Sequence, residues 1–231
     1  CTVLSLDEVD RDGQHKYGYA LVDKDGNIIK AVNRTNPNKK WDWYRLGGRW
    51  RGYFRIKPGG TGIVGDAGVF GNEVRPGWAD QARKGDVDWE GMRADAGAEA
   101  GAYWDRVHAV SPEGWESWAS VRDRIKDIDK ARDFYNNQPG RIALRASKDP
   151  DMMWAEDNVL VSRDAYVKRA EDATGVSFAL LVNGKWIKRG DMGWFGMHTD
   201  EVDYATWCKH VRELIDGLDD DVVLSAVDCH I

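Results

Sequence analysis

Long apolar runs are missing from this sequence. Its longest, such as Val222 to Val227, is far shorter than the roughly 18 residues that a membrane-spanning helix needs. The first residues also lack the basic stretch followed by an apolar one that marks a secretory signal. We therefore expect a protein that neither spans a membrane nor is a secreted precursor.

Cysteine is scarce as well. The three cysteines are Cys1, Cys208 and Cys229, and an odd number without regular spacing does not indicate a disulfide framework. Free thiols are typical of a reducing compartment. We therefore expect the protein in the cytoplasm.

The motifs of the common cofactor enzymes are also missing. The sequence has no Walker loop, no dinucleotide fingerprint, no HExxH or GxSxG motif and no paired CxxC. Its net charge of -6 disfavours general adhesion to nucleic acid, although a local basic patch can escape a global acidic balance. These observations argue against a common cofactor enzyme and against a protein that binds nucleic acid over its whole surface.

What the sequence does have is the composition of a folded domain and many tryptophans. Of its 231 residues, 42% are hydrophobic and 31% are charged, which is the balance of a globular protein and not of a disordered chain. Its 12 tryptophans can serve as core mass and as stacking platforms for bases or sugars.

Three turn signals predict β-hairpins. They are Asp25-Gly26 between residues 17–22 and 27–31, Gly47-Gly48 within residues 40–57, and Asn183-Gly184 between residues 178–182 and 185–189. Residues 58–92 are rich in glycine and aspartate and predict a long loop region, which in a compact domain is usually functional or mobile.

Helix caps and apolar periodicity predict about four helices, over residues 94–110, 111–136, 162–174 and 200–218. Ser111-Pro112-Glu113 supplies the start of the second helix, and Gln138-Pro139-Gly140 its end. A buried strand over residues 222–231 ends the chain. We expect a single α+β domain over residues 1–231, with a mainly antiparallel sheet; residues 1–16 are a lead-in or the remnant of a longer N-terminal region.

The segment from Lys40 to Lys57 is the most informative one. Folded around Gly47-Gly48 as a two-residue hairpin, it places Trp43 opposite Gly52 and gathers apolar rings on one face. This predicted core face comprises Trp41, Trp43, Trp50, Phe54 and Ile56.

The opposite face of that hairpin is predicted to be basic and aromatic. Its like charges repel at cross-strand distances, and one carboxylate cannot neutralise them, so an anionic partner would relieve the strain. Arginine forks and tyrosine rings suit a phosphate attached to a stackable base. The candidate ligand-binding residues are Asp42, Tyr44, Arg49, Arg51, Tyr53 and Arg55. The alternative is a solvated face whose arginines pair with acids elsewhere.

The same segment resembles the signature of an uncharacterised family of phage and prophage proteins. The matching residues are the run NPNKKWDWY at 36–44, Gly47-Gly48-Arg49-Trp50, residues 192–196 and the terminal VDCHI at 227–231. The resemblance runs from about residue 17 to the end, and longer members carry extra sequence before this region. It implies a phage-type accessory protein in the cytoplasm of the bacterial host cell and supplies no activity.

An acidic cluster lies near the end of the predicted loop region. Asp86, Asp88 and Glu90 alternate along the chain and precede Gly91, as at the start of a calcium loop. Gly97 stands where an EF-hand needs a glutamate, so an EF-hand is excluded. One hypothesis is a magnesium or calcium site completed by Asp66, Asp80 or Asp95; the alternative is an acidic loop or a partner for the basic face.

The C-terminal region offers weaker candidates for catalysis. Asp228 and His230 share one face of the predicted last strand, where an aspartate and a histidine can form half of a metal or acid-base site. The alternative is a histidine that is solvated or held by a hydrogen bond. His198, in a predicted loop before a helix, is a further candidate, and Cys229 is predicted to lie in the core.

These residues support hypotheses from different classes. The first is a phage-type accessory protein that binds a nucleotide, a nucleotide-derived signal or a short nucleic acid on the basic and aromatic hairpin. The second is a metal-assisted hydrolase or transferase acting on a similar phosphorylated substrate. The third is a structural or protein-interaction module that uses the tryptophan-rich surface.

Overall fold

A computed structural model of the chain describes residues 2–5, 15, 18–33, 43–68, 73–153, 155–192 and 198–230. The chain forms two compact units. The first unit comprises residues 1–45 and 227–231, and the second comprises residues 46–226. The expectation of a single domain over residues 1–231 stays a prediction.

The elements mix helices with small, mostly antiparallel sheets, which confirms the α+β fold class. The described residues form seven α-helices, more than the four or so predicted, because some are short and because one predicted helix is divided. None of the described helices is long and apolar enough to cross a membrane.

The first unit contains the predicted N-terminal hairpin. β2 (Gly18–Val22) and β3 (Ile28–Asn33) are antiparallel, and β1 (Thr2–Ser5) lies parallel to β2. The Asp23 carboxylate accepts the backbone N–H groups of Asp25 and Asn27, both at 2.9 Å, and so closes the turn. These hydrogen bonds hold the pKa of Asp23 below its usual value.

Short strands make up the β core of the second unit. Their bounds are β5 (Phe54–Arg55), β6 (Gly62–Ile63), β7 (Asp66–Ala67), β8 (Trp78–Ala79), β9 (Gln81–Arg83) and β14 (Val223–Ser225). β14, β9 and β6 form one antiparallel sheet, and β5 pairs with β8. The end of β4 (Trp43–Gly48) pairs in parallel with β7, and β15 (Val227–His230), which belongs to the first unit, is the last strand of the chain. The region predicted as a long loop, residues 58–92, therefore holds four of these strands, the turn of 3-10 helix η1 (Lys84–Asp86) and the start of α1.

The core of this β region is apolar and built from distant segments. Its buried members are Phe54, Ala82, Val87, Met92 and Ala226. Trp78 and Trp89 are half-buried against them. The core therefore joins the strands to the first turn of the longest helix.

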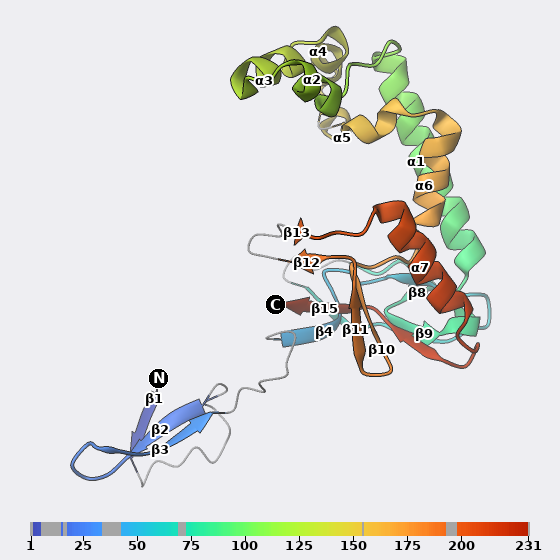
Figure 1. Cartoon of the computed structure of the whole chain (residues 1–231). Helices are drawn as coiled ribbons and strands as arrows, with labels where there is room; N and C mark the ends of the chain where they lie inside the picture. Colours follow the sequence, from blue (N-terminus) through green and yellow to red (C-terminus); the bar gives the residue numbers. More distant parts are fainter. Residues whose placement is uncertain are drawn as a thin grey trace. The chain divides into compact units, whose positions relative to one another are not determined.

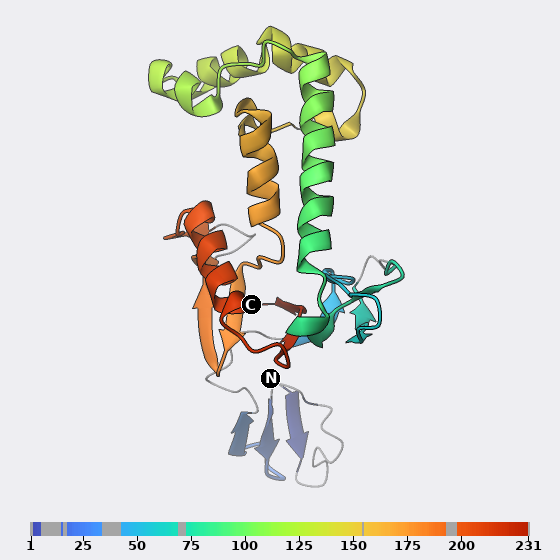
Figure 2. The same ribbon diagram turned by 90° about the vertical axis from the view of Figure 1, so that its right-hand side faces the viewer.

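That longest helix, α1 (Trp89–Val110), lies beside α6 (Arg163–Asp172), as Figures 1 and 2 show. A Cβ at Gly97 would lie 2.8 Å from the Glu171 carboxylate, and one at Gly101 would lie 2.7 Å from the Arg163 guanidinium. The two glycines thus permit the close approach of the helices. Ser162 accepts the N–H of Ala165 and starts α6 as predicted.

Four short helices form a helical cap at the far end of α1 (Figure 1). They are α2 (Trp118–Arg124), α3 (Ile128–Asn136), α4 (Pro139–Ala146) and α5 (Pro150–Met153), followed by the turn of 3-10 helix η2 (Asp157–Leu160). The cap has a core of its own, comprising Val107, Leu144, Met152, Ala155 and Val159.

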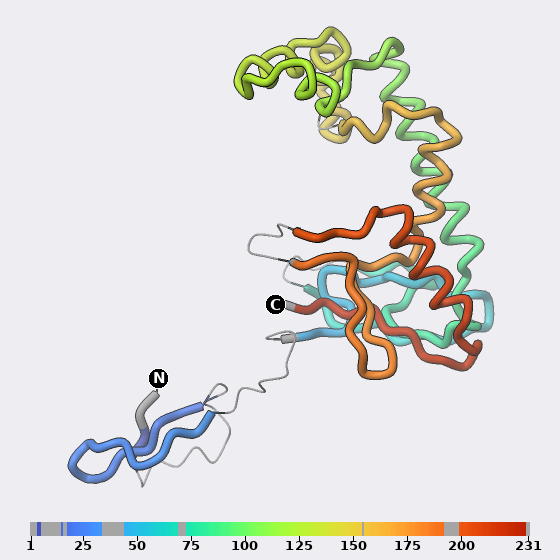
Figure 3. Tube along the Cα trace, in the orientation of Figure 1, coloured from blue at the N-terminus to red at the C-terminus, as the bar shows by residue number. Residues whose placement is uncertain are grey.

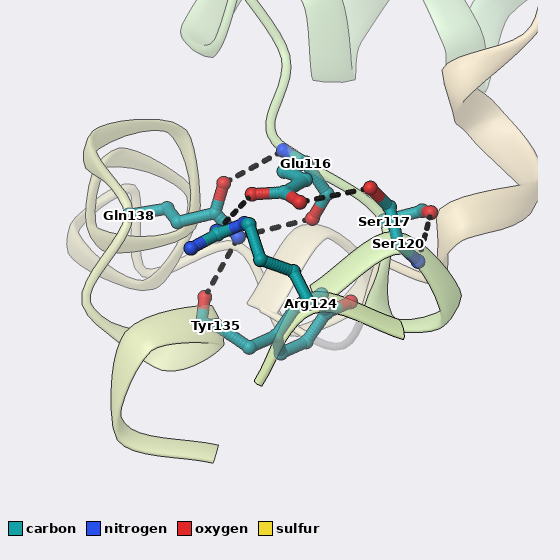
Figure 4. A network of polar contacts seen from close by, with 6 residues as sticks. All are labelled: Glu116, Ser117, Ser120, Arg124, Tyr135 and Gln138. Atoms are coloured by element: carbon teal, nitrogen blue, oxygen red, sulfur yellow. Dashed lines mark hydrogen bonds and ion pairs between the residues drawn. The ribbon is translucent and has the colours of Figure 1, made fainter. Parts of the chain in front are cut away.

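Polar contacts hold the cap helices together. The backbone N–H of Glu116 donates to the Gln138 side chain at 2.6 Å, while the Glu116 carboxylate accepts from Arg124 at 2.7 Å (Figure 4). The Asp157 carboxylate accepts the Tyr135 hydroxyl at 2.6 Å. Burial, and then this hydrogen bond, raise the pKa of Tyr135 to about 12.

The prediction of one helix over residues 111–136 is wrong. Ser111 ends α1 instead of starting a new helix, because its backbone N–H donates to Val107 O. Asp157 accepts the backbone N–H of Trp118 at 2.5 Å, and Asp127 caps a separate α3. Pro139, predicted to stop a helix, opens α4.

The C-terminal part follows the predictions more closely. β10 (Ala179–Val182) and β11 (Lys185–Lys188) form the predicted hairpin, visible in Figure 3, and Asn183 and Gly184 have positive φ. β12 (Asp191–Met192) pairs with β13 (His198–Thr199). α7 (Tyr204–Asp216) buries Trp207, Cys208 and Val211. The predicted last strand is divided at Ala226 into β14 and β15.

Candidate functional site

The predicted hairpin over residues 40–57 is wrong. Gly47 and Gly48 belong to β4, where they pair in parallel with Asp66 and Ala67 of β7. The chain turns just afterwards, with the backbone N–H of Trp50 donating to Gly47 O at 3.0 Å. We call residues 47–52 the Trp50 turn.

A buried carboxylate accounts for this difference. Asp80 is fully buried, and its side chain accepts the backbone N–H groups of Gly52 at 2.5 Å and Gly65 at 2.7 Å. A Cβ at Gly47 would lie 2.6 Å from the Asp80 carboxylate, so only glycine fits there. Contacts with a residue far along the chain thus override the local hairpin signal.

The core face predicted for that hairpin forms only in part. Phe54 is buried as predicted, whereas the prediction for Trp50 is wrong, because 56% of this residue is exposed. Trp41 and the side chain of Trp43 lie outside the described residues.

The predicted ligand-binding residues differ in burial and in their contacts. Tyr44 and Arg49 are exposed, Arg51 is half-buried, and Asp42 lies outside the described residues. Tyr53 contacts Phe54 edge to face, with ring centroids 5.0 Å apart, and burial raises its pKa to about 12. The hairpin register that would align these side chains is not the one that forms.

Arg55 pairs with acids from the neighbouring helix. Its guanidinium lies 3.0 Å from the Asp88 carboxylate and 2.7 Å from that of Asp95. For this residue the alternative interpretation, an arginine neutralised by acids elsewhere, is confirmed.

The predicted acidic cluster is divided among separate contacts. Asp88 caps α1 by accepting the N–H of Gly91 at 2.9 Å, Asp86 accepts the N–H of Thr61 at 3.3 Å, and Glu90 is exposed. In the described part of the chain, no three His, Cys, Asp or Glu side chains gather closely enough to hold a metal ion.

Of the catalytic candidates near the C-terminus, only Asp228 has a described side chain. Asp228 is buried in β15, while the side chains of His230 and His198 lie outside the description. Cys229, predicted to lie in the core, is half-buried, and Cys208 is buried.

Sequence reasoning missed a groove between α1, α6 and β8. Its volume is about 250 Å³. The lining residues are Arg75, Trp78, Met92, Asp95, Ala96, Glu99, Ala170, Ala173 and Thr174. They come from three segments that are far apart in the sequence, and we call the site the α1–α6 groove.

The polar groups of the α1–α6 groove have opposite charges. The Arg75 guanidinium lies over the Trp78 ring, 4.2 Å from its centroid. Neither Arg75 nor Glu99 has an ion-pair partner among the described residues, whereas Asp95 is paired with Arg55. The groove thus offers a cation, a separate carboxylate and an apolar floor of Trp78, Met92 and alanines.

The Trp50 turn adjoins this groove. A Cβ at Gly52 would lie 3.3 Å from the Val74 side chain and 3.9 Å from Cβ of Trp78. The glycine therefore lets the turn approach the segment that carries Arg75 and Trp78.

Comparison with protein-family models, with curated proteins and with solved structures finds no match for this chain. The resemblance to phage and prophage proteins therefore stays a prediction.

Proposed function

We propose that this chain binds a ligand that carries a phosphate group and a flat base, such as a nucleotide, in the α1–α6 groove. The observation that carries the proposal is the lining of the groove. It combines an arginine stacked on a tryptophan with a carboxylate that has no ion-pair partner in the described part of the chain, above an apolar floor.

In this proposal, Arg75 binds the phosphate group of the ligand. Stacking on Trp78 occupies the flat face of the guanidinium and leaves its N–H edge available to donate. Two parallel N–H groups match two phosphate oxygens, and such charge-assisted pairs are among the strongest hydrogen bonds in proteins.

The base lies on the floor of the groove in this proposal. Trp78 and Met92 supply apolar and aromatic surface, and Glu99 accepts N–H groups from the edge of the base. Because Arg55 neutralises Asp95, that second carboxylate adds little repulsion against a phosphate.

The size of the groove favours a ligand of one nucleotide unit. Ligand pockets in proteins typically measure roughly 300 to 1,000 Å³. At about 250 Å³ the groove is slightly smaller than that range, which suits a single base with its phosphate and not a large cofactor. The phage-type resemblance would make the protein an accessory factor in the cytoplasm of the bacterial host.

Calorimetric titration of nucleoside monophosphates, with the matching nucleosides beside them, tests the proposal. We expect Arg75→Ala to weaken monophosphate binding by about tenfold or more and to leave nucleoside binding nearly unchanged. Arg75→Lys should not restore the affinity, because an ammonium cannot reproduce the bidentate fork.

Arg132→Ala is the matched control. Arg132 is an exposed arginine of the helical cap, 3.5 Å from Asp129, and its loss should leave binding unchanged. Equal affinities of the wild type and Arg75→Ala, or no binding by either, would contradict the proposal. Recovery of the nucleotide unchanged after incubation with magnesium supports a binding protein, whereas a hydrolysed product supports the metal-assisted enzyme.

A further inference from the structure

The Trp50 turn displays an aromatic ring beside an arginine. The Trp50 residue is 56% exposed, and the Arg49 guanidinium lies 5.8 Å from the centroid of its ring. Large aromatic rings usually contribute to the core, and an exposed tryptophan next to a cation is typical of surfaces on which nucleic-acid bases stack.

The backbone that carries this ring is held in place on several sides. Asp80 binds the N–H of Gly52 and, more weakly, that of Tyr53, at 3.4 Å. The Asp80 backbone N–H donates to Ile63 O, and its carbonyl accepts from Ala226, both at 2.8 Å. Because the turn is already ordered, a ligand that stacks on Trp50 loses less conformational entropy on binding.

Trp50 is also close to the α1–α6 groove along the chain. Gly52 lies against Trp78, and two residues span at most about 7 Å of extended chain. The Cα atom of Trp50 therefore lies within about 7 Å of that of Gly52, on a segment that contacts one of the groove residues.

We infer that the ligand contains at least two linked nucleotides, with one base in the α1–α6 groove and the next stacked on Trp50. This inference rests on the proposed function, because it takes the groove as the first subsite. It commits to a single strand, since a base paired within a duplex cannot offer its face to a tryptophan. Arg49, on the same turn, lies beside the ring where a linking phosphate would pass.

The test is a length series of single-stranded thymidine oligonucleotides with a 5′-phosphate, from one to six units, titrated into the full chain by calorimetry. A matching duplex is the additional probe. We expect affinity to rise by about tenfold between one and two units, because a second base stacks. Trp50→Ala should abolish this rise and leave the affinity for the mononucleotide unchanged, whereas Trp50→Phe should retain part of it.

Phe134→Ala is the matched control, because Phe134 is a 40% exposed ring of the helical cap with the Arg124 guanidinium 4.7 Å from its centroid. It should bind every length as the wild type does. Circular dichroism of each variant confirms that it is folded.

The possible failures are distinguishable. If the mononucleotide binds through Arg75 but affinity does not depend on length or on Trp50, the two-base inference is overturned and the proposed function stands. Equal affinity for the duplex also overturns the inference. If no length binds, both are overturned.

Discussion

Asp80 lies at the centre of the contacts that hold the Trp50 turn. Its carboxylate is fully buried and accepts backbone N–H groups from two loops, at Gly52 and Gly65. Removing it would leave these donors without an acceptor, at a cost of roughly 1 to 3 kcal/mol each.

We expect Asp80→Ala to lower the free energy of unfolding by about 3 kcal/mol or more, as measured in urea. Asp86→Ala, whose carboxylate accepts only 3.3 Å bonds from Thr61, should cost less than about 1 kcal/mol. Similar losses for the two variants would show that Asp80 does not hold the loops together.

At the scale of elements, the contact between α1 and α6 sets the width of the groove's helical wall. Gly101 lies against Arg163, which also pairs with Asp105 at 2.9 Å, so a larger side chain must displace this arginine. We expect Gly101→Leu to destabilise the protein by about 1 to 3 kcal/mol in urea unfolding, through overpacking. Ala98→Leu, at an exposed position of the same helix, is the matched control and should change stability by less than about 0.5 kcal/mol. If the two leucine variants were equally stable, close packing at Gly101 would not be required.

Some helices and hairpins could be predicted from the sequence, and others could not. The hairpins at Asp25-Gly26 and Asn183-Gly184 were predictable because their turns depend on residues within the turn itself. The turn signal at Gly47-Gly48 failed because a distant carboxylate, Asp80, binds the backbone after it. The helix predicted over 111–136 starts only at Trp118, whose backbone N–H donates to the distant Asp157, and a local cap at Asp127 divides it. The hairpin at Gly47-Gly48 thus failed through a distant buried acceptor, whereas the long helix failed in part through a local cap that the apolar pattern concealed.

At the scale of the whole second unit, the groove is a product of tertiary structure. Arg75 and Trp78 lie within the stretch predicted as a long loop region, but Glu99 comes from α1 and Ala170 from α6, and the sequences of these helices show no link to them. The predicted basic and aromatic face depended on one hairpin register and was lost with it. We propose that the ligand class inferred from arginine beside aromatic rings binds instead at Arg75 with Trp78 and at Trp50 with Arg49.

Methionine methyl NMR tests the location of the binding site most directly, because the chain has only five methionines. Met92 lines the α1–α6 groove, and Met152 is buried in the core of the helical cap. On titration with a nucleoside monophosphate, we predict that the Met92 methyl signal shifts, that the Met152 signal stays in place, and that Arg75→Ala removes the shift at the same ligand concentration. A Met92 signal that stays unchanged while the nucleotide binds would contradict the account.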